Sequence, residues 1–248
     1  MESNDNSSFR ILEWDSAHFG LRIGRVLPAK ADAQLFKDAS TWADQRALDC
    51  MYLLLDSRDT LAIRLAGDNG WRIVDVRVTL GLELTRPIES HSSIRRANAQ
   101  DLPYLTQLAK DSHKDSRFYS DGNFAPAACD ELFSIWIAKS VQDPDFAGAV
   151  FVAERKGAKP AGYITCAAAR GTGTIGLIAV DPAARGEGLG RNLLAAAAFW
   201  FSEQGAKRAT VVTQGCNIAA LRMYERYGFR SESVQFWFHW WRTGKGRF

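Results

Sequence analysis

The amino-acid sequence predicts an α/β protein, of the α+β type, in which helices flank a mixed central sheet. Two observations carry this prediction. Strand-like and helix-like patterns alternate along the chain, and a glycine-rich loop joins an apolar strand to a long helix in the second half. With 248 residues, 46% of them hydrophobic, the chain can bury the core of one large domain or of two modest ones.

A strand, helix, strand pattern occurs twice, at a constant offset of 158 residues that pairs Asp59 with Asn217 and Gly70 with Gly228. In each copy an apolar run precedes a capping residue, a helix and a glycine that ends the helix. The pattern predicts a degenerate internal duplication. The alternative is that any strand–helix–strand unit favours glycine at this corner.

The two copies differ where ligand chemistry would lie. Ala66 stands at the position of Tyr224, and residues 27–32 contain no glycine where residues 185–190 contain three. The first copy therefore has the packing residues and lacks the candidate site residues.

A domain boundary is predicted in the polar segment 86–93, which contains proline and several serines. It separates a supporting N-terminal domain, residues 1–90, from residues 91–248. After the boundary the predicted elements are, in chain order, a strand at 94–96, a helix capped by Asp101 and ending near Lys110, an aromatic loop at 116–126, a helix at 127–142, strands at 150–155 and 162–168 around a turn at 156–160, a buried strand at 175–180, and a helix at 191–201.

Charge and cysteine content exclude several classes of protein. The formal net charge of +3 comes from 31 basic and 28 acidic residues without a long basic run, so general nucleic-acid binding is not expected. The four cysteines are widely spaced, without a CxxC pair or a neighbouring histidine at ligand spacing. We therefore expect neither a metal site nor a disulfide framework.

Neither the N-terminal residues nor the apolar runs of the chain indicate a membrane protein. The N-terminus is polar and does not have the pattern of a secretory signal, and the apolar run at 193–201 is far shorter than the ~20 residues that span a bilayer. We expect a soluble cytoplasmic protein with no membrane partner.

The loop at 185–190, Arg-Gly-Glu-Gly-Leu-Gly, is the main candidate for ligand binding. Its glycines let backbone N–H groups converge, and the following helix directs the positive end of its dipole to the same place. A phosphate or pyrophosphate is the ligand that such a loop favours.

Asn217 and Tyr224 lie seven residues apart on one face of the next predicted helix, about 10 Å along its axis. They could contact one elongated ligand. The alternatives are that Asn217 only caps the helix and that Tyr224 is a core aromatic.

This ordered set of motifs resembles the acetyl-CoA-binding motifs of the GNAT superfamily of N-acetyltransferases. The resemblance covers residues 94–240 and implies a GNAT fold whose residues 1–90 are a degenerate GNAT-like half domain and whose residues 91–248 are the catalytic domain. It also implies a cofactor-binding set that comprises Ile178, Ala179, Val180, Arg185, Gly186, Glu187, Gly188, Leu189, Gly190, Arg191, Asn217, Ala220 and Tyr224.

The resemblance assigns the loop amides to the CoA pyrophosphate, Ile178 and Val180 to the pantetheine and acetyl carbonyl, and Tyr224 to protonation of the departing thiolate. Physical chemistry agrees, because a phenol with a pKa of about 10 is a plausible donor to a thiolate whose conjugate pKa is about 8.5. The general base stays unassigned; a water relay to Glu154 or another carboxylate is one hypothesis. No metal is expected.

Short aromatic stretches are similar to the TDP-fucosamine (dTDP-4-amino-4,6-dideoxygalactose) N-acetyltransferase family. They are residues 14–20, 116–118, 136–137 and 236–238. The implied acceptor is the amine of a nucleotide-linked amino deoxysugar used for surface polysaccharide.

Arg117, Phe118 and Tyr119 are the candidate substrate-binding residues, because a guanidinium beside aromatic rings can hold a diphosphate and stack a base or sugar. A solvated arginine beside two packing aromatics is the alternative. Trp237, Trp240 and Trp241 cover either core or a homodimer surface.

Three hypotheses follow. The first is an acetyl-CoA-dependent N-acetyltransferase that acts on a nucleotide amino sugar by direct attack on the thioester. The second keeps acetyl-CoA but takes another amine, such as a peptide N-terminus, a lysine or a small molecule. The third is a catalytically silent acyl-CoA-binding module.

Overall fold

The computed structural model describes residues 8–28, 30–85, 93–155 and 159–244, and the chain divides into two compact units. Unit 1 consists of Met1–Arg77, Ser116–Ala128 and Val234–Phe248, and unit 2 of Val78–Asp115 and Cys129–Ser233. The limits of these units do not follow a single cut near residue 90, because two later segments belong with the first unit. The division into a supporting and a catalytic domain stays a prediction.

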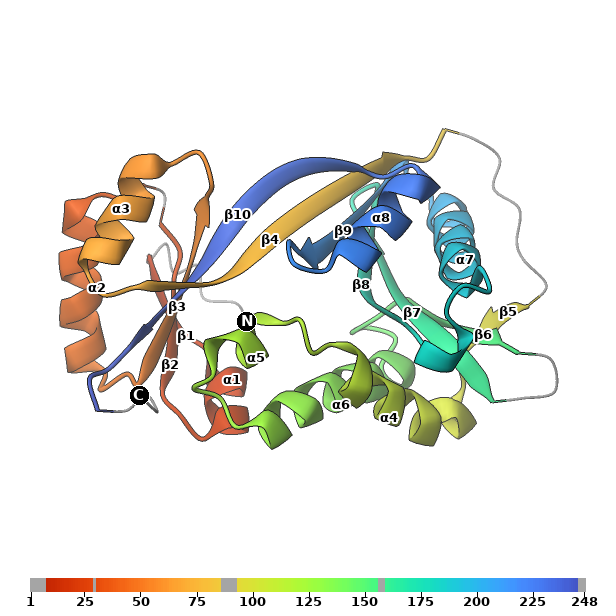
Figure 1. Cartoon of the computed structure of the whole chain (residues 1–248), viewed down its shortest axis with the longest axis horizontal. Helices are drawn as coiled ribbons and strands as arrows, with labels where there is room; N and C mark the ends of the chain where they lie inside the picture. The colour runs from red at the N-terminus through yellow and green to blue at the C-terminus, as the bar shows by residue number, and fades with distance from the viewer. Residues whose placement is uncertain (1–7, 29, 86–92, 156–158, 245–248) are drawn as a thin grey trace. The chain divides into compact units, whose positions relative to one another are not determined.

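Unit 1 contains a mixed sheet covered on one face by two helices (Figure 1). Strand β2 pairs antiparallel with β1 and parallel with β3, and β3 pairs antiparallel with β10. The elements of unit 1 are β1 (Phe9–Ile11), α1 (Glu13–Phe19), β2 (Ile23–Val26), α2 (Ala33–Gln45), β3 (Cys50–Asp56), α3 (Thr60–Asp68), the first part of β4 (Arg72–Glu83), α5 (Arg117–Asp121) and the last part of β10 (Arg230–Trp241).

The core of unit 1 lies between its sheet and helices α2 and α3. Phe36 and Ala39 of α2 and Ala62 of α3 are buried together with Met51 and Leu53 of β3. Since successive strand residues point to opposite faces, the even-numbered residues of β3 lie on the other face of this sheet.

Unit 2 also contains a mixed sheet, in which β5, β6, β7 and β8 pair antiparallel in order and β8 pairs parallel with β9. The remaining elements are β5 (Ile94–Arg96), a 3₁₀ turn (Ala99–Asp101), α4 (Leu102–Ser112), α6 (Pro126–Gln142), β6 (Ala149–Glu154), β7 (Pro160–Ala169), β8 (Thr172–Val180), a second 3₁₀ turn (Pro182–Ala184), α7 (Leu189–Glu203), β9 (Arg208–Gln214) and α8 (Ile218–Tyr227).

Helices α4 and α7 cover opposite faces of the unit 2 sheet. A Cβ at Gly162 of β7 would lie 3.3 Å from Leu193 of α7, whereas the next residue, Tyr163, contacts His113 at the end of α4. Neighbouring strand residues point to opposite faces, so the two helices sandwich β7 and β8. The predicted mixed sheet flanked by helices is confirmed.

The element bounds repeat at the predicted offset of 158 residues. Strands β3 and β4 take the bounds of β9 and β10 when 158 is added, helix α3 starts where α8 starts, and α2 ends where α7 ends. Common ancestry of the two copies stays a prediction.

The last strands of the two copies are exchanged. Strand β3 pairs with β10 over Cys50–Asp56, and β4 is the hydrogen-bonded neighbour of β9. In each copy, the strand that precedes the repeated helix therefore has the other copy's last strand beside it: β10 lies beside β3, and β4 lies beside β9.

Several sequence predictions need correction. Residues 116–126 are not a plain loop, because Arg117–Asp121 forms the short helix α5, which ends at Gly122 in the left-handed conformation. The Asp101 side chain does not cap α4; it accepts the Asn98 N–H in a capping box around the preceding 3₁₀ turn.

Other predictions fall partly outside the described part of the chain. Of the predicted boundary segment 86–93, only Ser93 lies within the described residues, and of the predicted turn 156–160, only Lys159 and Pro160 do. Among the residues that it does describe, every helix is too short or too polar to cross a membrane.

Candidate active site

The parallel pair β8 and β9 is hydrogen-bonded over only part of its length. Pairing runs from Thr172 with Arg208 to Ile175 with Val211 and does not continue beyond it in the described residues. The other edge of β8 stays paired with β7 as far as Gly162 with Val180. Ile178, Ala179 and Val180 therefore lie on a strand segment with one neighbour only.

A β-bulge in β8 explains why the pairing stops. Thr165 of β7 stands opposite two residues of β8, Gly176 and Leu177, and the Leu177 N–H donates to Thr165 Oγ1 at 2.8 Å. A bulge bends its strand and increases the local twist. A Cβ at Gly176 would lie 2.7 Å from Thr165 Oγ1, so this position requires glycine.

The loop that follows β8 has the backbone conformation of an anion cradle. Gly186 and Gly188 have φ angles of 85° and 80°, in the left-handed region that favours glycine. Gly188 is the N-cap of α7, and its carbonyl accepts the first helical hydrogen bond from Asn192 N–H at 3.1 Å. The N–H groups of Leu189, Gly190 and Arg191 precede that bond, so they have no partner within the helix.

Gly190 is required for a different reason. A Cβ there would lie 2.6 Å from Met223 Sδ, so the glycine allows α7 to pack closely against α8. The three glycines of the loop thus divide between backbone conformation and helix packing.

Charged side chains surround the cradle. Arg185 and Arg191 flank it in the chain, and both are exposed. Glu187 is bound by Arg155, whose Nη2 lies 2.5 Å from Glu187 Oε1 and whose Nε donates to Oε2 at 3.1 Å. Because that pair is bidentate, Glu187 adds little net negative charge at the place where an anion would bind.

Asn217 caps α8, as one of its two predicted roles requires. Its Oδ1 accepts the Ala220 N–H at 3.0 Å, and at the equivalent place Asp59 Oδ1 accepts the Ala62 N–H at the same distance. The Asn217 Nδ2 has no hydrogen-bond partner among the described residues. Asn217 of the second copy therefore has an N–H donor, Nδ2, that the capping residue of the first copy, Asp59, lacks.

Tyr224 is buried, with 2% of its surface exposed, and its ring packs edge-on to Phe229 with centroids 5.7 Å apart. Its hydroxyl has no hydrogen-bond partner among the described residues, yet it is not one of the fully buried polar atoms. Burial raises the pKa of Tyr224 above its usual value, so the phenol is protonated across the physiological pH range. The Tyr224 hydroxyl is thus available to a ligand as a donor.

The predicted cofactor set belongs to unit 2, on β8, the glycine loop, the start of α7, and α8 from its cap Asn217 to Tyr224 in its last turn. The predicted substrate residues Arg117, Phe118 and Tyr119 belong to unit 1. The two sets were expected in one domain, and the structure assigns them to separate compact units.

Glu154, the carboxylate named in the base hypothesis, forms an ion pair. Its carboxylate lies 2.6 Å from Arg95 Nε. The same guanidinium binds Asp101 through two hydrogen bonds, at 2.8 and 2.9 Å. The Glu154 carboxylate is therefore already engaged by an arginine that also holds Asp101.

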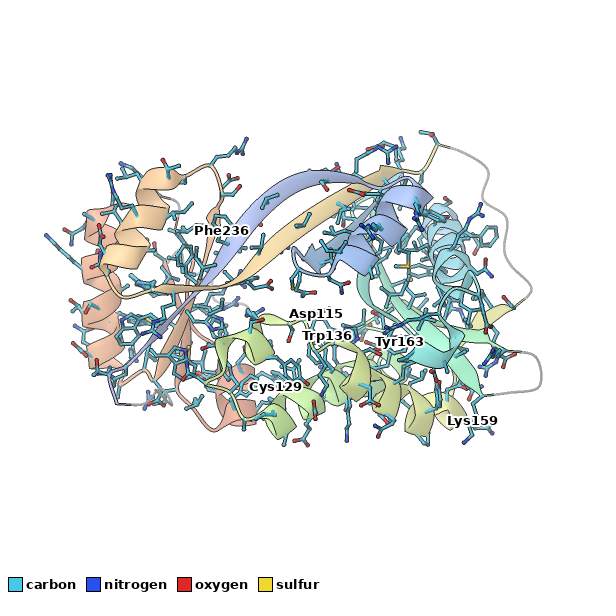
Figure 2. The ribbon with its side chains drawn as sticks, viewed as in Figure 1. Asp115, Cys129, Trp136, Lys159, Tyr163 and Phe236 are labelled. Carbon is cyan, nitrogen blue, oxygen red and sulfur yellow. The ribbon has the colours of Figure 1, made fainter. Side chains whose placement is uncertain are left out.

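One buried pair near β8 was not predicted from the sequence. His113 Nε2 lies 2.8 Å from the hydroxyl of Tyr163, which stands opposite Ala179 in the ladder. Tyr163 is labelled in Figure 2. Burial lowers the pKa of His113 to about 4, so the ring is neutral at pH 7. A lone histidine at a helix end gives no sequence signal for such a contact. Within the described residues, no group of three or more His, Cys, Asp or Glu side chains is placed to hold a metal ion.

The interrupted strand pair, the glycine cradle and the helix that follows it define the class of the protein. Residues 107–229 match the model of the Acetyltransferase (GNAT) family. The chain therefore contains a GNAT acetyltransferase domain and is an acetyltransferase; the GNAT family uses acetyl-CoA as cosubstrate.

Known proteins extend this similarity over most of the chain. The dTDP-fucosamine acetyltransferase of Escherichia coli O6:H1 is 26% identical over 235 residues, which cover 94% of this chain and 98% of that protein. The spore coat polysaccharide biosynthesis protein SpsD of Bacillus subtilis is 28% identical over 57% of this chain and 48% of its own. The crystal structure of a GCN5-related N-acetyltransferase from Sphaerobacter thermophilus has a TM-score of 0.64 at 16% identity, covers 93% of this chain and 75% of its own, and shows the fold alone.

Proposed function

We propose that the protein transfers the acetyl group of acetyl-CoA to the amine of a nucleotide-linked amino deoxysugar. The observation that carries the cofactor part of this proposal is the end of β8–β9 pairing at Ile175 and Val211. The acceptor part is supported by the end-to-end similarity to a dTDP-fucosamine acetyltransferase.

The described residues fit acetyl-CoA in two places. Beyond Ile175, β8 offers backbone groups on an unpaired edge, to which an extended amide-containing chain can add like a further strand. The cradle at Gly186 and Gly188 offers N–H groups and the helix dipole to a pyrophosphate, and an added Cβ at either glycine would meet no protein atom within 4 Å. Asn217 Nδ2 would donate to the same ligand.

Acetyl-CoA supplies the acetyl group as a thioester, which an uncharged amine attacks while the C–S bond breaks. The role proposed for Tyr224 is to give its phenolic proton to the departing sulfur. The raised pKa of this tyrosine makes a free tyrosinate costly, so the proton lost by the attacking amine must return to the phenol as the step completes. The group that carries that proton is unassigned.

Arg117, Phe118 and Tyr119 are proposed to contact the acceptor. Arg117 lies with its guanidinium carbon 4.3 Å from the ring centroid of Phe118. An arginine held against an aromatic ring keeps its donor edge free for phosphate oxygens.

The proposal is tested by measuring thiol release from acetyl-CoA with nucleotide-linked amino sugars, the matching free amino sugars, and lysine-containing peptides. A nucleotide amino sugar is expected to give the highest kcat/KM. If free amines or peptides turn over equally well, the acceptor is another amine. If none does, the chain is a silent acyl-CoA-binding module.

The role of Tyr224 is tested with a matched pair of variants on α8. Tyr224→Phe should lower kcat by about 10²-fold or more and leave acetyl-CoA affinity within about threefold. Tyr227→Phe, three residues later on the same helix, should leave both unchanged. Equal kcat in the two variants would remove Tyr224 from the proton-donor role.

A further inference from the structure

Unit 1 concentrates buried polar atoms that no protein group satisfies. Within the described residues, six buried side-chain nitrogen or oxygen atoms lack a hydrogen-bond partner, and five belong to unit 1. These five are Arg25 Nε, the Tyr52 hydroxyl, Ser116 Oγ, Arg117 Nε and His239 Nε2. Native proteins rarely leave such atoms unpaired, because each costs about as much as a lost hydrogen bond.

The five atoms come from residues that adjoin one another. Tyr52 and His239 stand opposite each other on β3 and β10, with ring centroids 4.5 Å apart. The Arg117 guanidinium carbon lies 5.0 Å from the ring centroid of Tyr52 and 4.4 Å from that of Trp237. The Arg25 guanidinium carbon lies 5.2 Å from the same Trp237 centroid.

This cluster lies on the sheet face opposite α2 and α3. Val26 and Leu53 of β2 and β3 are buried against those helices, so their neighbours Arg25 and Tyr52 point the other way. Arg25, Arg117 and Trp237 are only half-buried, so the cluster reaches the surface of the protein.

Neither arginine forms an ion pair with a carboxylate in the part of the chain that the structure describes. Among the described residues no hydrogen bond joins Arg25 or Arg117 to an acidic side chain; Asp15 interacts with both through its charge, and Asp75 interacts with Arg117 in the same way. A guanidinium packed on aromatic rings keeps its N–H groups at the ring edge, where a planar or tetrahedral anion can accept from them.

The cluster presents both donors and acceptors. Arg25, Arg117 and Tyr52 offer N–H and O–H donors. The Nδ1 of His239 contacts Asp121, which fixes the proton on that nitrogen, and burial lowers the pKa of His239 to about 4. Its Nε2 is therefore an acceptor at pH 7, and Ser116 can serve in either role.

We propose that unit 1 contains a binding site for a phosphate ester, in which Arg25, Arg117 and Tyr52 donate to phosphate oxygens and His239 Nε2 accepts from a ligand hydroxyl. Phosphate suits the donors because guanidinium groups match its oxygens, and a hydroxyl-bearing ester suits the acceptor. The ligand is either a free sugar phosphate or the diphosphate of a nucleotide. Because Arg117 is also proposed to contact the acceptor, the inference rests on the proposed function where the ligand is a nucleotide diphosphate; binding of the ester is measured separately from acetyl transfer.

The test is isothermal titration of the full chain with thymidine 5′-diphosphate, glucose 1-phosphate and thymidine, in the presence of saturating CoA so that the unit 2 cradle is filled. At least one phosphate ester should bind and thymidine should not, and the tighter of the two esters identifies the source. Absence of binding by either ester at millimolar concentration would overturn the proposal.

Three variants separate this site from a structural role. Tyr52→Phe removes only a hydroxyl that has no protein partner, so it should fold normally and weaken binding about tenfold. Arg117→Gln should abolish binding, and Arg58→Gln, an exposed arginine of the same unit, should leave it unchanged. Binding that Tyr52→Phe and Arg117→Gln both leave intact would refute the assignment.

Discussion

Asn217 offers a test in which helix capping and ligand binding can be separated, because the chain contains a matched cap. The Oδ1 of Asn217 and that of Asp59 each accept a backbone N–H at 3.0 Å at the start of equivalent helices. Replacing a capping residue by alanine costs about 1 kcal/mol. Asn217→Ala and Asp59→Ala should therefore lower the unfolding temperature by similar amounts.

The substitution Asn217→Asp should change the affinity for acetyl-CoA without weakening the helix cap. Aspartate keeps the Oδ1 acceptor, and its charge is favourable at a helix N-terminus by about 0.3–1 kcal/mol, so thermal stability should not fall. The variant loses the Nδ2 donor. A hydrogen bond to a charged group contributes about 1.5–3 kcal/mol, so the acetyl-CoA Kd should rise about tenfold to a hundredfold.

Calorimetric titration with acetyl-CoA and thermal unfolding of the three variants provide the two readouts. Asp59→Ala is expected to lose stability at unchanged affinity, and Asn217→Asp to lose affinity at unchanged stability. If Asn217→Asp binds acetyl-CoA as tightly as the parent protein, the amide does not contact the cofactor and capping is its role.

Two further predictions concern glycines of the backbone, and a third concerns the ion pair between Arg95 and Asp101. Gly188→Ala and Gly171→Ala both place a side chain at positive φ in open space and should cost about 1–2 kcal/mol each, but only Gly188→Ala should weaken acetyl-CoA binding in a titration. Gly176→Ala should lower the unfolding temperature through overpacking of about 1–3 kcal/mol at the β8 bulge, and a parent-like temperature would argue against it. The hydrogen-bonded Arg95 lowers the pKa of Asp101 in the folded protein. The ion pair therefore stabilises the folded state fully at pH values above the pKa of aspartate in the unfolded chain, about 4, and this stabilisation is lost as the pH falls through the lower pKa of the folded state. Asp101→Asn should thus destabilise at pH 7 in urea unfolding and match the parent at low pH; a constant gap would contradict the linkage.

Local sequence patterns predicted the features whose residues lie close together in the chain. The glycine loop, the helix after it, and the capping residues Asp59 and Asn217 were all predicted, because each depends on residues within a few positions of one another. The helix α5 was missed because five residues are too few to show a period.

The β8 bulge lies at the limit of sequence reasoning. Gly176 sits in an apolar strand pattern, where an isolated glycine can mark a bulge or a close approach. The partner that makes it a bulge, Thr165, comes from the neighbouring strand, and only the register of β7 and β8 shows that one residue opposes two.

By itself, the sequence determined the mixed sheet flanked by helices, the repeated strand–helix–strand unit and the glycine loop, because hydrophobic period, caps and glycines act locally. Tertiary structure alone decided that β3 pairs with β10 and that β4 lies beside β9, since strand partners compete through burial and hydrogen bonding over long separations. It also decided that Arg25, Tyr52, Arg117 and His239 meet on one sheet face. Residues so far apart in sequence come together only when the chain folds.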